Sequence, residues 1–158
     1  MLDRLLPATI DNTYRGRRSA LWLFGLVAAL RAMQSLVIIF DGRTVARGAD
    51  GIPLDAYPPD AAQTAVALFA QGALWRLFIA LLCVLVLVRY RSAVPFMFVV
   101  LALGFLGSQL LLRLVPFVRV GAPPGPYVNL ATFALMVVGL ALSLWPRRGE
   151  PAAPGRRV

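Results

Sequence analysis

The chain has 158 residues, of which 59% are hydrophobic and only 15% are charged, and its mean hydropathy is +0.76. A soluble domain carries about 25% charged residues and interrupts its apolar runs with polar residues at the helix or strand period, so this composition excludes a soluble globular fold. The net charge is +9, but most arginines flank the apolar runs, which favours membrane topology and anionic lipid over nucleic acid as the reason for the basic charge.

Several residue types that carry chemistry are missing. The chain has no histidine and no lysine, and its single cysteine is Cys83. These absences exclude an intramolecular disulfide, haem held by two imidazoles and histidine-based zinc or copper sites. They also leave no nucleophile-and-base pair for hydrolysis. We therefore expect no catalytic residues, no metal, no cofactor and no enzymatic activity.

The first apolar stretch follows an N-terminal segment, residues 1–19, that is predicted to be cytoplasmic. It covers residues 20–40, which is long enough to span a bilayer at 1.5 Å per residue. A cleaved signal peptide would have a shorter apolar core and a small-residue exit site, so this stretch is expected to be an uncleaved span. Residues 41–61 then form a loop whose aspartates lack the alternating spacing of a calcium site.

Three further spans follow. The second covers residues 62–88, with Asp60 as its expected N-cap, and a four-residue link joins it to the third at 93–115. Residues 116–126 are rich in proline and glycine and are predicted to be a loop before the fourth span at 127–145. The tail, 146–158, is expected to be cytoplasmic and disordered. The predicted fold is an all-α integral membrane protein with four transmembrane helices in an antiparallel bundle.

The arginines predict the orientation. Ten of them lie before the first span, in the link between spans two and three, or after the fourth span, whereas four lie in or beside the loops 41–61 and 116–126. The positive-inside rule therefore places both termini in the cytoplasm and both loops in the periplasm. The all-arginine basic set, with abundant alanine and glycine, suggests a GC-rich bacterial genome, so we expect a multi-pass protein of the bacterial inner membrane.

Two arginines lie inside the predicted spans. Arg31 and Arg76 are each about 12 residues from the cytoplasmic boundary, ~18 Å deep, so antiparallel spans bring them to the same level. Each costs about 2.5–3.5 kcal/mol if it faces lipid. No acid is expected at that depth, since none of the seven acidic residues lies inside an apolar run.

Other polar residues of the spans also fall in the periplasmic half, while the cytoplasmic half is almost wholly apolar. This asymmetry predicts a polar pocket that opens to the periplasm and is closed toward the cytoplasm, rather than a continuous pore. The candidate pocket residues are Arg31, Gln34, Gln71, Arg76, Gln109, Arg113 and Asn129.

Three explanations for the span arginines stay open on the sequence. They bind an anionic group of a ligand, they are satisfied by nearby amides and carbonyls or by reaching toward the interface, or a partner subunit supplies an acid. The first function we expect is a non-enzymatic accessory or assembly component with a membrane protein partner or a homo-oligomer. The alternative is a binding or transport component for an anionic amphiphile or lipid.

Overall fold

The computed structural model describes residues 5, 10–14, 16–116 and 118–145, and these residues form helices and no strand. Within these described residues, four helices are long and apolar enough to cross a membrane. They are α2 (Arg18–Gly48), α3 (Pro59–Arg89), α4 (Val94–Leu114) and α5 (Gly125–Leu144), with short 3-10 turns η1 (Leu54–Ala56) and η2 (Arg91–Ala93) between them. The predicted disordered tail, 146–158, lies outside the described residues.

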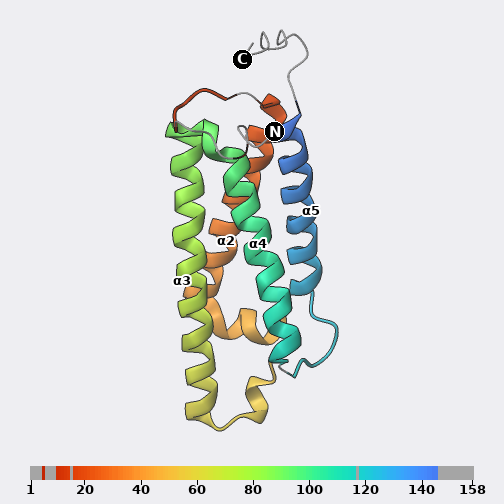
Figure 1. Ribbon diagram of the computed structural model, residues 1–158. Helices are drawn as coiled ribbons and strands as arrows, with labels where there is room; N and C mark the ends of the chain where they lie inside the picture. Colours follow the sequence, from red (N-terminus) through yellow and green to blue (C-terminus); the bar gives the residue numbers. More distant parts are fainter. Residues whose placement is uncertain (1–4, 6–9, 15, 117, 146–158) are drawn as a thin grey trace, which may run out of the picture.

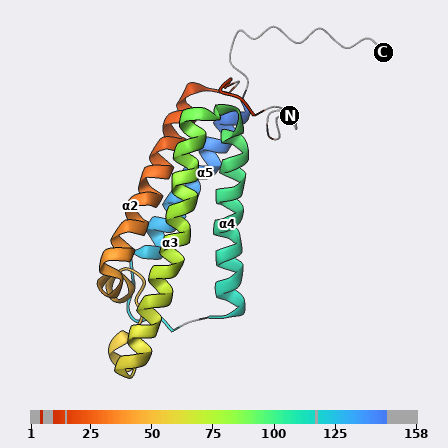
Figure 2. The same cartoon turned by 90° about the vertical axis from the view of Figure 1, so that its left-hand side faces the viewer.

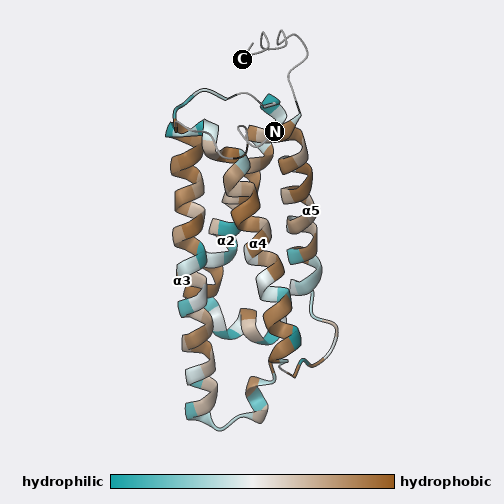
Figure 3. Cartoon of the chain, in the orientation of Figure 1, coloured by the Kyte–Doolittle hydropathy of each residue, from teal (hydrophilic) through white to brown (hydrophobic). Residues whose placement is uncertain are grey.

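The four helices run side by side, and consecutive helices point in opposite directions (Figures 1 and 2). The start of α2, the link between α3 and α4, and the end of α5 lie together at what we call the terminal end (Figure 1). Residues 42–58 and 118–124 lie at the opposite end, which we call the loop end. In Figure 3, hydrophilic colours interrupt the helices mainly in the half nearer the loop end.

Helix α2 continues well beyond the predicted span, which was expected to give way to a loop at residue 41. Asp41 has non-helical backbone angles (φ −137°, ψ 49°), and after this kink the helix continues to Gly48. The segment 42–48 turns across the loop end (Figure 1), where Ala46 is buried against Leu54 and Ala62. Hydropathy therefore locates the end of the apolar run, whereas the helix itself stops only near Gly48.

Helix α3 begins at Pro59, three residues before the predicted start of the second span. The prediction that Asp60 caps this helix is wrong, because Pro58 occupies the N-cap position and no side chain caps the helix. Pro59 suits the first helical position because its missing N–H would have no partner there. Asp60 lies in the first turn instead, where a negative charge is favourable toward the helix dipole.

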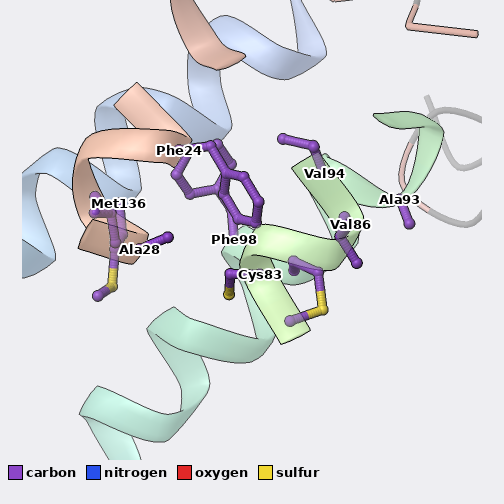
Figure 4. Packing of buried hydrophobic residues seen from close by; sticks show 10 residues of the cluster. Phe24, Ala28, Cys83, Val86, Ala93, Val94, Phe98 and Met136 are labelled. Carbon is purple, nitrogen blue, oxygen red and sulfur yellow. The ribbon is translucent and has the colours of Figure 1, made fainter. Parts of the chain in front are cut away.

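The terminal half of the molecule is filled by a cluster of buried side chains from all four helices (Figure 4). At its centre, the rings of Phe24 and Phe98 meet edge to face, with centroids 5.1 Å apart. Phe98 also lies against Gly139 of α5, where an added Cβ atom would overlap its ring. Met136 and Cys83 are two further, fully buried members of the cluster. This half of the molecule is therefore closely packed.

Substituting Gly139 tests that packing. Gly139→Ala is expected to lower the free energy of unfolding by about 1–3 kcal/mol, because the new methyl group has to displace a fully buried aromatic ring. Gly107→Ala is the matched control, since a Cβ atom at this helical position of α4 meets nothing within 4 Å. Unfolding in mixed detergent checks both variants. Equal stability of the two would contradict close packing at Gly139.

Candidate functional site

A cavity of about 540 Å³ lies between the four helices on the loop-end side of the buried cluster. Helices α3 and α4 separate toward the loop end (Figure 2), and the cavity wall draws on both of them, on α2 and α5, and on the two connections at the loop end. Its polar lining residues are Arg31, Asp50, Arg76, Ser108, Gln109, Arg119 and Asn129.

Four of the seven residues predicted for a polar pocket line this cavity: Arg31, Arg76, Gln109 and Asn129. The other three do not line it, and their places follow from helix geometry. Gln71 is exposed and lies five residues before Arg76, about 140° around the helix. Arg113 is exposed at the last turn of α4, and Gln34 is half-buried elsewhere on α2. Depth along a span does not determine which way a side chain points.

Arg31 is half-buried on α2 and reaches across to α5. Its Nη1 donates a hydrogen bond to Oδ1 of Asn129 over 3.3 Å. An amide acceptor of this kind is one of the partners expected for the arginine from the sequence. A guanidinium has five N–H donors, so this single bond leaves others available toward the cavity.

Arg76 is half-buried on α3 and approaches the same cavity. Its Nε donates to the carbonyl oxygen of Gly72 at 3.4 Å, and its guanidinium carbon lies 5.9 Å from the centre of the Phe69 ring. Both contacts lie on its own helix and hold the stem of the side chain. The guanidinium lines the cavity close enough to Arg31 for the two positive charges to repel each other.

An acid also lines the cavity, and its presence corrects the expectation that no carboxylate lies near the span arginines. The kink at Asp41 turns residues 42–48 across the loop end, and the chain that follows places Asp50 on the cavity wall. This residue lies outside the apolar runs, so hydropathy gave no reason to place it beside Arg76. The kink is the feature that sequence reasoning missed.

Backbone hydrogen bonds hold the chain on both sides of Asp50. The N–H of Gly125 donates to the carbonyl of Ala49 at 2.8 Å, and the N–H of Val120 donates to the carbonyl of Gly51 at 2.8 Å. Gly51 has a φ of 71°, which glycine adopts without strain. These bonds join the two connections of the loop end, so the position of Asp50 depends on both.

The electrostatics of Asp50 combine two opposing effects. Burial raises the pKa of its carboxyl group, while the positive charges of Arg76 and Arg119 lower the pKa. Within the described part of the chain, no ion pair joins Asp50 to Arg31 or Arg76, whereas Arg47 and Asp55 form one at 2.7 Å outside the cavity. Charges of opposite sign therefore line one cavity.

Apolar side chains form the rest of the wall. Trp75, Ile79, Phe105 and Leu112 contribute from α3 and α4, and Cys83 lies where the cavity meets the buried cluster. The described residues include no group of three or more metal-ligating side chains. The arrangement is suited to hold a molecule that has a charged head and an apolar body. No protein-family model, curated protein or solved structure shows significant similarity to this chain.

Proposed function

We propose that this protein crosses the bacterial inner membrane four times, with both termini in the cytoplasm, and binds an amphiphile that carries an anionic group in its head. Four sufficiently long apolar helices support the topology, and so does the sequence count, in which ten arginines lie before the first span, between spans two and three or after the fourth span, against four in or beside the other two loops. We propose binding rather than catalysis as the role.

The observation that carries this proposal is the cavity lined by Arg31 and Arg76. Its volume of about 540 Å³ lies within the usual range of ligand pockets, about 300–1,000 Å³. Arginine side chains favour phosphate and carboxylate groups because their planar N–H donors match two acceptor oxygens at once. Three arginines and one aspartate line the cavity, and this positive excess in a mainly apolar surrounding favours the binding of an anionic group.

The wall between α3 and α4 favours an amphiphile over a small soluble anion. Trp75 lines the cavity and is nevertheless 67% exposed, so this wall also faces the surroundings of the helices. In a membrane those surroundings are lipid chains. We infer that the head of the ligand lies near the arginines while its chains leave between α3 and α4.

Arg76→Gln tests the proposal. We expect at least a tenfold loss of bound amphiphile, because a hydrogen bond to a charged group contributes about 1.5–3 kcal/mol and each 1.4 kcal/mol corresponds to tenfold in affinity. The measurement is native mass spectrometry of the protein extracted from its own membrane in mild detergent. Arg113→Gln is the matched control, because Arg113 is exposed and outside the cavity. Equal amphiphile retention by both variants would contradict the proposal.

An accessory or assembly role is the competing proposal, and one observation favours it. Gly107 of α4 is exposed and does not line the cavity, and an added Cβ atom there would meet nothing within 4 Å, so this position has room for a close-packing helix. The same mass spectra distinguish the two roles. A second polypeptide or a defined homo-oligomer without bound amphiphile would support the accessory role.

A further inference from the structure

We propose that the head of the ligand is zwitterionic, with a phosphate bound by Arg31 and Arg76 and a primary ammonium bound by Asp50. The chemical class is a phosphoethanolamine-type amphiphile. This inference rests on the proposed function and specifies the ligand of the same cavity. It follows from the presence of both signs of charge on one cavity wall.

Backbone hydrogen bonds place Asp50 on the cavity wall. Its own N–H donates to the carbonyl of Val45 at 3.1 Å, and both of its neighbours accept hydrogen bonds from the opposite connection. At Gly125 an added Cβ atom would lie 2.7 Å from Oδ1 of Asp50, so the carboxylate is packed directly against the start of α5. The backbone of Asp50 is therefore held in place, and its carboxylate lies on the cavity wall against the start of α5.

A partly buried carboxylate needs a compensating partner. Arg76 and Arg119 are near enough to act on Asp50 electrostatically, but Arg76 forms no ion pair with it, and the nitrogen Nε of Arg76 is directed to Gly72. A ligand ammonium beside Asp50 adds the direct ion pair that Arg76 does not form, while the phosphate of the same head lies beside Arg31 and Arg76. A purely anionic head would satisfy the arginines but would bring a like charge toward Asp50.

The number of N–H donors indicates which kind of amine the head carries. A primary ammonium has three N–H donors for a carboxylate, whereas a choline head has none. We therefore expect ethanolamine heads to bind better than choline heads of equal net charge. Serine heads carry the same ammonium but add a carboxylate, which again approaches Asp50 with a like charge.

The experiment offers the full-length protein an equimolar mixture of phosphatidylethanolamine, phosphatidylglycerol and phosphatidylcholine in detergent, and native mass spectrometry counts the bound lipids. The unchanged protein is expected to retain ethanolamine lipid about tenfold over either competitor. Asp50→Asn is expected to abolish this preference, and Asp50→Glu to preserve it in part because the charge remains. Asp55→Asn is the control, since Asp55 is exposed, pairs with Arg47 and lies outside the cavity.

The outcomes separate the two proposals. In one outcome, the unchanged protein prefers phosphatidylglycerol, and Asp50→Asn binds more phosphatidylglycerol than the unchanged protein does. Asp50 then repels the bound head, so the zwitterionic head is wrong, while the proposed binding of an anionic amphiphile is supported. If Asp50→Asn and Asp55→Asn behave alike, Asp50 does not contact the head, and the inference is also overturned. If no lipid is retained, or if retention does not depend on Arg76, the proposed function itself fails.

Discussion

Replacing both span arginines, in the double variant Arg31→Gln/Arg76→Gln, is expected to lower bound amphiphile by about a hundredfold. Each guanidinium provides charge-assisted hydrogen bonds of about 1.5–3 kcal/mol to an anionic head, and two such losses correspond to at least two factors of ten. Both residues line the same cavity, so their effects act on one ligand. Native mass spectrometry with titrated lipid measures the change.

The stability of the same variant distinguishes a binding role from a structural one. Both arginines are half-buried at the cavity, and the contacts that they make are few and long, such as the 3.3 Å bond from Arg31 to Asn129, so the double variant is expected to unfold at about the same denaturant concentration as the unchanged protein. A matched control is Arg43→Gln/Arg113→Gln, which removes two exposed arginines outside the cavity. Marked destabilisation of the cavity variant alone would mean that Arg31 and Arg76 act through contacts such as that with Asn129 instead.

The sequence predicts the spans well because apolar length is a strong and local signal. All four expected spans lie within or closely overlap the helices of the structure. The boundaries differ where factors other than hydropathy decide them. Helix α2 continues past its apolar run to Gly48, and α3 starts at Pro59 because proline suits the first helical turn.

The candidate site was predictable only in part. The distances of Arg31 and Arg76 from the span ends are enough to predict that the two residues lie at one level. In the structure both line the cavity. Gln71 and Arg113 have a suitable depth but point elsewhere, which depends on how each helix is rotated about its axis. Asp50 reaches the cavity through a kink at Asp41 and two loop hydrogen bonds, and these arise from tertiary contacts that no local pattern reports.

The aromatic cluster at the terminal end leads to the second large expected effect. Phe98→Ala is expected to lower the free energy of unfolding by about 3 kcal/mol, the lower end of the range for such changes, because lipid is as apolar as the protein interior and lost packing dominates. Phe98 is fully buried against Phe24 and Gly139. Phe96→Ala is the control on the same helix, since Phe96 is 41% exposed and should lose far less.

A double-mutant cycle between Phe98 and Gly139 makes this prediction specific to their contact. Gly139→Ala is destabilising when the Phe98 ring is present, because the added methyl group overlaps it. In the Phe98→Ala background the ring is gone, so the same change should be neutral or should partly restore stability by occupying the space that the ring leaves. The expected coupling is about 1–3 kcal/mol, as for residues in direct contact. Additive effects would mean that the two residues do not touch, and the close packing that separates the cavity from the terminal end would lose its structural basis.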